Sequence, residues 1–479
     1  MSRRTSRWTP ALVALLSLTV LSACGGADAA LSAQQREQST RTDVPFTSCD
    51  KAACTGKIDG AAYDIRMPDT WNGTLLIYSH GYRQAEPSPP DFDAVDTRPA
   101  PAPTEEVGAA LLAQGYALAG SAFKTNGWDV ADGVGADEKL HAFFADKIGE
   151  PDRVYVWGDS LGGLITETVA EKHPEWVSGV APLCGVLGGG NLNLDLALDV
   201  AYAVKTLIYP DLKLTGFTSH DEAVQNWQGA YDAITKAGGD LTKGVPAILM
   251  VAAMVDAPTQ TRTYDGSTIE SQVRARAESI LTALGYGTFG RYEIEQRVGG
   301  NPSGNDQTDY STRVSAEEQS LIETVSAGST RDLLSALQNG ERVTADPAAR
   351  KAFGALGNPT GKLQDPTVTL HTTADPLVLV QNERVFADRV KAAAGRTSDV
   401  VQLYVTPPAS YTEAAGAPYG AGHCNFSTEQ RVGLITLLDG WVRKATFPTG
   451  GAIAAAFGND PAVTQAYQPG PWPAADASL

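Results

Sequence analysis

The chain has 479 residues, of which 43% are hydrophobic, and its formal net charge is −18. This acidic balance argues against nucleic acid as a partner, because binding to phosphate requires a cationic surface. The length exceeds the usual size of a single hydrophobic core, so we expect one large domain with an insertion, or two domains.

The N-terminus has the features of an export signal. Three arginines precede an apolar stretch, residues 11–21, that is too short to span a bilayer comfortably. The following Leu-Ser-Ala-Cys sequence is similar to the lipobox of bacterial lipoproteins, in which the cysteine, here Cys24, is lipidated. We expect residues 1–23 to be a signal peptide and residues 24–45 to be a flexible tether. The expected product is a cell-envelope lipoprotein or a secreted protein, with an ordinary cleavage site beside a chance cysteine as the alternative.

Strands and helices are predicted to alternate over the next part of the chain. The predicted strands are residues 57–67, 74–79, 116–123, 153–157 and 177–183, and the predicted helices are residues 105–115, 134–148 and 161–173. Alternation at this spacing favours a parallel sheet that is covered by helices on both faces.

A mostly helical stretch then interrupts the pattern. The strongest helical segments in it are residues 221–237, 269–284 and 316–337, and alternation resumes with strands at 367–371 and 400–405 and helices at 381–394 and 428–444. We therefore predict an α/β core over residues 46–190 and 361–446, with a helical cap inserted at residues 191–360, because insertions occur at loops. The Gly-, Ala- and Pro-rich tail, residues 447–479, is expected to be loosely packed or mobile.

The candidate nucleophile is Ser160. The sequence Gly-Asp-Ser-Leu-Gly at residues 158–162 matches the G-x-S-x-G pattern, which alone occurs often by chance. Here the pattern directly follows a hydrophobic strand and directly opens a helix, as a nucleophile elbow requires. The hydroxyl would then lie at a helix N-terminus, whose partial positive charge favours a developing anion. A purely structural serine is the alternative.

A serine nucleophile needs a base, and His423 is the best placed of the six histidines. It lies in a glycine-containing loop after the last predicted core strand, which gives the chain order serine, acid, histidine. His80 and His371 end predicted strands, so they could approach the same site. The others, His141, His173 and His220, lie in predicted helices or in the insertion.

The acid of such a site should follow the preceding strand. Asp375 does so after one turn, and Pro376 would block further sheet pairing there. The carboxylate would fix the tautomer of His423 and stabilise its imidazolium form. The alternatives are an ordinary turn aspartate and the rival Asp365, which precedes the strand and would lie at its wrong end.

An oxyanion needs two backbone N–H donors. Leu161, directly after the nucleophile, is predicted to supply one. The loop after the first parallel strand should supply the other through the N–H of Tyr82, with His80 and Gly81 holding the turn.

The cysteine count favours disulfides. Without Cys24 four cysteines remain, an even number that suggests two bridges with three possible connectivities. Cys49 and Cys54 are near neighbours and are expected to close a small loop, which leaves Cys184 and Cys424. Metal binding is the weaker alternative, because no CxxC motif is present.

The loop after the first parallel strand, the Ser160 elbow, the Asp375 turn and the His423 loop together resemble the α/β-hydrolase superfamily. The resemblance covers residues 57–190 and 361–445. It implies a mostly parallel central sheet with a cap inserted over the active site. The helical stretch follows the strand after the elbow, which is the position in the chain where α/β-hydrolases commonly insert this cap.

The cysteine that follows the histidine also resembles the tannase and feruloyl esterase group. In that group a disulfide joins the residue before the serine to the residue after the histidine. Here Asp159 precedes the serine, so a Cys184–Cys424 bridge would be a variant that ties the next strand to the histidine loop.

We derive three functional hypotheses from these features. The first is an esterase that cleaves small or moderate esters through an acyl-enzyme, without a cofactor or metal. The second is a secreted aminopeptidase or other peptidase of the same superfamily, which would hold a substrate amine with carboxylates such as Glu293 and Glu295. The third is a non-catalytic surface lipoprotein that binds a ligand or partner.

Overall fold

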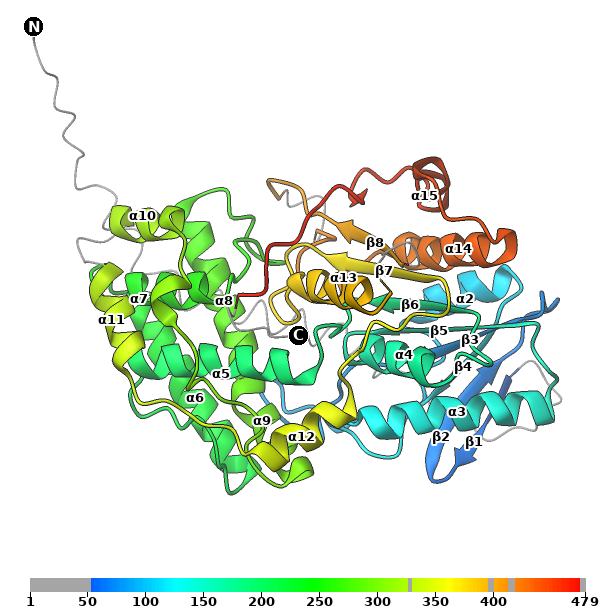
Figure 1. The fold of residues 1–479 in the computed structure, drawn as a ribbon, viewed down its shortest axis with the longest axis horizontal. Coiled ribbons are helices and arrows are strands. Elements are labelled where there is room, and N and C mark those ends of the chain that lie inside the picture. The colour runs from blue at the N-terminus through cyan, green and yellow to red at the C-terminus, as the bar shows by residue number, and fades with distance from the viewer. Residues whose placement is uncertain (1–52, 326–329, 395–399, 412–417, 474–479) are drawn as a thin grey trace, which may run out of the picture.

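The computed structural model describes residues 53–325, 330–394, 400–411 and 418–473 (Figure 1). The predicted signal peptide, the tether, Cys24 and Cys49 lie outside these residues. Cys54 is disulfide-bonded. No helix in the described part of the chain is long and apolar enough to cross a membrane.

The core is a nine-stranded sheet in the order β1-β2-β4-β3-β5-β6-β7-β8-β9. The strands are β1 Ala53–Ile58, β2 Ala61–Arg66, β3 Thr74–Ser79, β4 Ala117–Ser121, β5 Arg153–Asp159, β6 Gly179–Leu183, β7 Thr367–Thr372, β8 Val400–Val405 and β9 Val463–Thr464. The six strands from β4 to β8 in this order pair in parallel, whereas β1, β2 and β9 are antiparallel at the edges. The α/β-hydrolase fold predicted from the sequence is confirmed by this sheet.

Helices cover both faces of the sheet. Alternate residues of each strand point to opposite faces, and because both sets are apolar, both faces need to be covered. Leu75 and Ile77 of β3 pack with the helices of one face, whereas Leu76 and Tyr78 pack with those of the other. The first face carries α3 Val130–Lys147 and α4 Leu161–Lys172, and the second carries α2 Glu105–Ala113 and α14 Thr428–Lys444. A further helix, α13 Gln381–Ala394, connects β7 to β8.

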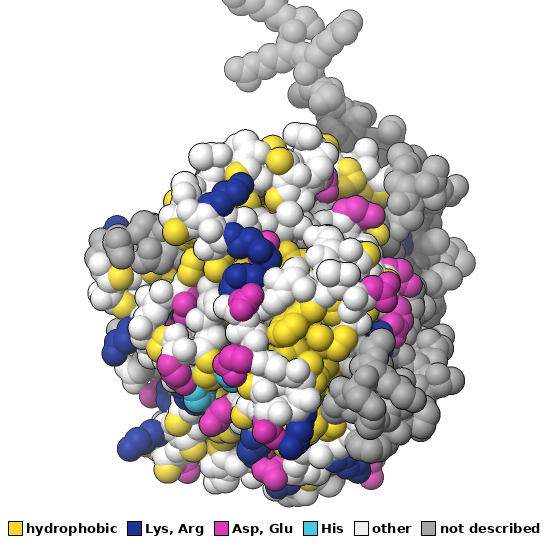
Figure 2. All heavy atoms as spheres, turned by 90° about the vertical axis from the view of Figure 1, so that its right-hand side faces the viewer, with side chains coloured by type: hydrophobic (Ala, Val, Ile, Leu, Met, Phe, Trp, Pro, Cys, Tyr) yellow, Lys and Arg dark blue, Asp and Glu magenta, His cyan; other side chains and the backbone are white. Residues whose placement is uncertain are grey.

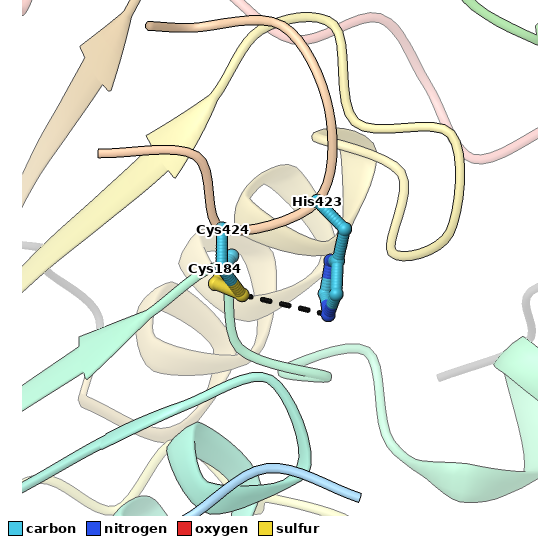
Figure 3. Close-up of side chains that lie close together, drawn as sticks. All are labelled: Cys184, His423 and Cys424. Atoms are coloured by element: carbon cyan, nitrogen blue, oxygen red, sulfur yellow. Dashed lines mark hydrogen bonds between the residues drawn. A yellow bond between two sulfur atoms is a disulfide. The ribbon is translucent and has the colours of Figure 1, made fainter. Parts of the chain in front are cut away.

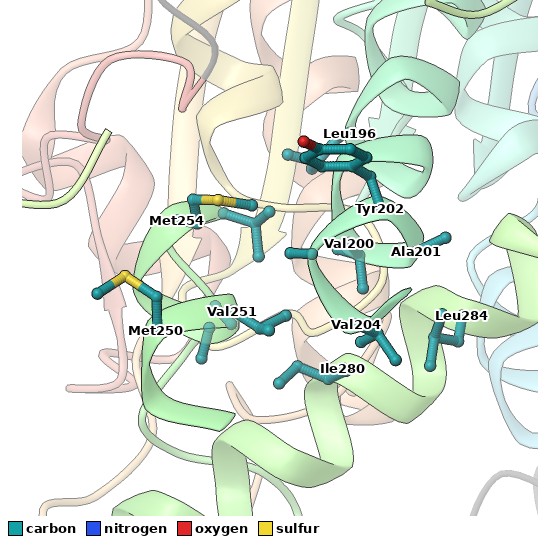
Figure 4. Close-up of a cluster of buried hydrophobic side chains, with 14 of the residues drawn as sticks. Leu196, Val200, Ala201, Tyr202, Val204, Met250, Val251, Met254, Ile280 and Leu284 are labelled. Atoms are coloured by element: carbon teal, nitrogen blue, oxygen red, sulfur yellow. The ribbon is translucent and has the colours of Figure 1, made fainter. Parts of the chain in front are cut away.

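The chain between β6 and β7 forms a helical cap beside the core (Figure 1). Its helices are α5 Gly190–Leu207, α6 His220–Ala237, α7 Gly244–Met254, α8 Ile269–Gly287, α9 Phe289–Val298, α10 Ala316–Val325, α11 Thr330–Asn339 and α12 Pro347–Leu356. Apolar side chains of α5, α7 and α8 meet in one buried cluster, which gives the cap a hydrophobic core of its own (Figure 4).

The C-terminal tail differs from the prediction. Residues 450–473 contain α15 Gly450–Ala456 and strand β9, which pairs with β8 and extends the sheet. Ile453, Phe457 and Trp472 are buried, so this part of the tail is packed against the body rather than loose. The prediction was wrong because Gly and Ala dominate the segment's composition, while a few widely spaced apolar side chains anchor it.

The end of the core remote from the cap has a mixed surface (Figure 2). Lys and Arg side chains are interspersed with Asp and Glu side chains around an apolar patch near the centre of this face. The negative net charge is therefore not concentrated here in a block of one sign.

Candidate active site

Ser160 lies in a sharp turn between β5 and α4. Its backbone has φ 60° and ψ −119°, a region that non-glycine residues occupy only under constraint. The neighbouring glycines make the turn possible, since a Cβ at Gly158 or at Gly162 would lie 2.5 Å or 1.9 Å from the carbonyl oxygen of Ser79. The Ser160 N–H donates to the carbonyl of Leu183 at 2.9 Å, which fixes the turn to the neighbouring strand.

His423 and Asp375 form a hydrogen-bonded pair. The distance from His423 Nδ1 to the Asp375 carboxylate is 2.8 Å, and the carboxylate is fully buried. The other carboxylate oxygen accepts the N–H groups of Leu377 and Val378, both at 2.9 Å. Because a carboxylate only accepts, Nδ1 of His423 carries the proton, and Nε2 is left as a base.

The charge state of Asp375 follows from its neighbours. Burial alone would raise the pKa of this carboxyl, but His423, His371 and the Leu377 N–H together hold the pKa below its ordinary value. Asp375 is therefore ionised at neutral pH and can stabilise a protonated His423. The rival Asp365 precedes β7, at the other end of the strand from Asp375.

Ser160 and His423 line the same cavity, which has a volume of about 410 Å³ and lies between the core and the cap. Gly81 closes on the serine from the β3 loop, since a Cβ at this position would lie 3.4 Å from Ser160 Cβ. The two predicted oxyanion donors lie next to the serine in the chain or in space. Tyr82, which follows Gly81, lines this cavity, and Leu161, which follows Ser160, is the first residue of α4. Their N–H groups have no hydrogen-bond acceptor among the described residues.

His80 supports the loop that carries Tyr82. Its Nδ1 lies 2.7 Å from the carbonyl oxygen of Gly81, and its ring stacks on Phe123 at 4.1 Å. Burial, with the nearby charge of Arg83, lowers the pKa of His80 to about 3, so the ring is neutral and donates to the carbonyl. His80 is thus a structural residue of the turn, as predicted.

A buried pair lies behind the acid: His371, which the sequence analysis expected to be able to approach the site, and Glu383, which it did not identify. His371 Nε2 lies 2.8 Å from the Val378 carbonyl, and Nδ1 lies 3.2 Å from Glu383 on α13. Burial lowers the pKa of His371, but the charges of Glu383 and Asp375 outweigh this effect and raise it. The pair holds the loop whose N–H groups bind Asp375, so both residues position the acid. Glu383 carries no motif that could have identified it.

Two connections hold the histidine loop. Cys184, at the end of β6, and Cys424 form a disulfide, and the Cys424 sulfur lies 3.4 Å from His423 Nε2 (Figure 3). In the second connection, Arg431 Nη1 donates to the Asp159 carboxylate at 2.6 and 2.7 Å, and Nη2 donates to the Cys424 carbonyl at 2.9 Å. Asp159 therefore links the serine turn to the histidine loop through an ion pair.

The cysteines and His423 also form the one group of the described residues whose ligand atoms are close enough for a metal ion. Both sulfurs are engaged in the disulfide, so neither offers a thiolate, and the donor set does not fit a metal.

Ser160, Cys184 and Cys424 all have positive φ angles, of 60°, 43° and 52°. Unfavourable backbone angles thus gather around the catalytic candidates, as is typical of functional sites.

The carboxylates considered for binding a substrate amine are held elsewhere. Glu293 bonds Arg297 and the N–H of Trp128, and Glu295 accepts from the N–H of Gly216. Neither residue lines the cavity that contains Ser160 and His423.

Asp137 supports the strand end beneath the site. This fully buried carboxyl on α3 accepts a hydrogen bond from Ser79 at 2.6 Å. Burial, only partly offset by this bond, raises its pKa from 3.8 to about 7.

This pKa predicts a pH-dependent stability. The folded protein holds the Asp137 proton more tightly than the unfolded chain, so the contribution is full below pH 3.8 and is lost as the pH rises through about 7. We expect the wild-type melting temperature to fall between pH 5 and pH 8 relative to that of Asp137→Asn, which cannot titrate. Asp146→Asn, on the exposed part of the same helix, is the control and should follow the wild type. Parallel curves for wild type and Asp137→Asn would contradict the prediction.

No protein-family model matches the chain, and no curated protein is detectably similar. Similar solved structures include an esterase from Aspergillus oryzae, with 13% identity over 83% of this chain and 80% of that chain and a TM-score of 0.38. Feruloyl esterase B from the same organism has 15% identity over 83% and 80% of the two chains and a TM-score of 0.37. The rice cell wall degrading esterase LipA from Xanthomonas oryzae has 13% identity over 81% and 87% and a TM-score of 0.35. At these values none of them informs on the substrate of this chain.

Proposed function

We propose that the chain is a serine hydrolase that cleaves carboxylic esters, with Ser160, His423 and Asp375 as its catalytic triad. The observation that carries the proposal is the hydrogen bond of 2.8 Å between His423 and Asp375. His423 lines the same cavity as Ser160, which lies in a nucleophile elbow. A nucleophile, a base and an orienting acid are the three roles that acyl transfer requires.

The mechanism follows from these groups. Ser160 Oγ attacks the ester carbonyl while His423 Nε2 takes its proton, and the N–H groups of Tyr82 and Leu161 stabilise the oxyanion. When the intermediate collapses, His423 returns the proton to the leaving alcohol and the acyl group stays on Ser160. Water, deprotonated by His423, then attacks the acyl-enzyme, and the acid is released. Asp375 stabilises the imidazolium in both steps.

A fluorophosphonate probe tests the proposal directly. The wild-type protein should be labelled once, with the modified peptide containing Ser160, because only an activated serine reacts rapidly. His423→Ala should slow the labelling strongly while leaving the fold intact. Failure to label folded wild-type protein, or labelling at another serine, would favour a non-catalytic binding role. Rapid labelling with cleavage of aminoacyl amides but not of simple esters would favour a peptidase.

We also propose that the protein is exported and held at the cell envelope by a lipid on Cys24. The proposal is supported by the arginines, the apolar stretch and the lipobox-like sequence at the N-terminus. Cys24→Ser should abolish incorporation of labelled fatty acid and release the protein from membranes. If the variant remains bound to membranes, the lipid on Cys24 is not the anchor.

A further inference from the structure

Ser160 lies between two cavities of different character. The first has a volume of about 60 Å³ and is lined mostly by apolar side chains of the cap and of the loop after β7. The second is the cavity of about 410 Å³ that also contains His423. Ser160, Tyr286 and Leu377 line both cavities, so they mark the point where the two meet at the nucleophile.

The position of His423 decides which part of an ester each cavity would hold. In the mechanism proposed above, His423 must give its proton to the leaving alcohol, so the alcohol has to lie on the side of the serine that faces this ring. His423 lines the second cavity and does not line the first. The acyl chain therefore occupies the first cavity, next to Leu161.

The size and lining of the first cavity restrict the acyl chain. Val200 on α5 and Ile280 and Ala283 on α8 belong to its wall (Figure 4 labels the first two). Measured as the space open to the centre of a water-sized sphere, roughly 10–15 Å³ of cavity holds one water-sized group. The first cavity, at about 60 Å³, therefore accommodates about four to six heavy atoms. The lining offers few polar partners, which favours an aliphatic chain over a charged or hydroxylated one.

The second cavity offers larger and more polar surroundings. Its cap side carries aromatic rings, among them Trp227, Tyr231 and Phe289, and its core side carries charged side chains such as Arg83 and Asp96. It shares residues, including Tyr82 and Gln84, with a neighbouring cleft of about 800 Å³. The cleft is lined largely by polar side chains.

We propose that the natural substrate is an ester between a short aliphatic acid and a bulky, polyhydroxylated alcohol. The cavity around Val200, Ile280 and Ala283 selects the acid, while the second cavity and the adjoining cleft hold the alcohol between aromatic rings and hydrogen-bonding groups. This inference rests on the proposed esterase activity.

Two matched substitutions on α8 test the assignment of the cavities. Ala283 lines the first cavity and Ala277 the second, and both are half-buried. We expect Ala283→Leu to lower kcat/KM for p-nitrophenyl hexanoate at least 10-fold relative to p-nitrophenyl acetate, because the added carbons fill the acyl space. Ala277→Leu should leave this ratio within 2-fold of the wild type. It should instead lower kcat/KM for a glucose butyrate ester at least 5-fold relative to ethyl butyrate.

A second variant keeps the test decisive if Ala283→Leu fails to fold. Val200→Ala enlarges the first cavity and should move the preferred acyl length upward by one or two carbons. The inference is overturned if the wild-type enzyme prefers decanoate to butyrate, or if Ala277→Leu rather than Ala283→Leu changes the acyl profile. It is also overturned if the glucose ester is hydrolysed no better than ethyl butyrate. Loss of all ester hydrolysis in the wild type would instead refute the proposed function itself.

Discussion

Ser160→Ala is expected to lower kcat for p-nitrophenyl butyrate on the order of 10⁶-fold, with little change in KM. The hydroxyl supplies the bond that splits ester hydrolysis into two easier steps, and no neighbouring group can replace it. The variant keeps the oxyanion donors and both cavities, so it should still bind the ester. Steady-state kinetics on the purified full-length protein, compared with the rate in buffer, measure the effect.

Asp375→Asn is expected to lower kcat for the same ester, but by less than Ser160→Ala does. An amide in place of the carboxylate favours the wrong tautomer of His423, so kcat should fall about 10⁴-fold while the structure is kept. Circular dichroism and the melting temperature of both variants show whether the fold is intact. If Ser160→Ala retained the wild-type rate, the triad proposed here would be wrong, and the activity would arise from another group.

Much of the core and of the site could be predicted because each feature has a local signal. The elbow at Ser160 follows an apolar strand and opens a helix, and Asp375 and His423 each follow a strand in the expected chain order. Parallel strands bring their carboxyl ends to one edge of the sheet, so the three residues were expected to meet there. Strand β8 and helices α13 and α14 were predicted with the boundaries that the structure shows.

The features that were missed depend on contacts between distant segments. Arg431 lies 272 residues from Asp159, and nothing in the sequence of α14 distinguishes it from a surface arginine. Glu383 similarly acts through polar contacts with neighbouring strands, among them those with His371 on β7 and Gln402 on β8. Helices α5, α7, α9 and α12 of the cap were also not identified. For α7 the reason is that a largely buried helix has no polar face from which its period could be recognised.

Cys184→Ala/Cys424→Ala is expected to lower the free energy of unfolding by about 5 kcal/mol, since the bridge closes a loop of 240 residues. Urea unfolding of the wild type and the double variant measures the loss. At temperatures well below the melting temperature of the variant, kcat should fall only slightly from the wild-type value. The reason is that Arg431 still binds the carbonyl of residue 424 and the Asp375 loop remains in place. Loss of activity in parallel with the disulfide, in protein that is still folded, would show that the bridge alone positions His423.

The ion pair is the natural partner for this test, because both connections end on Cys424. Arg431→Met/Asp159→Asn removes the two charges together, whereas Arg431→Met alone would leave a buried carboxylate without its counter-ion and cost about 3–5 kcal/mol. Groups that share a contact point are not expected to be independent. With either connection intact we expect kcat to stay within about 10-fold of the wild type, and with both removed to fall well beyond the product of the separate effects. Multiplicative losses would mean that each connection acts on its own side of the loop, and that the His423 ring is held chiefly by Asp375.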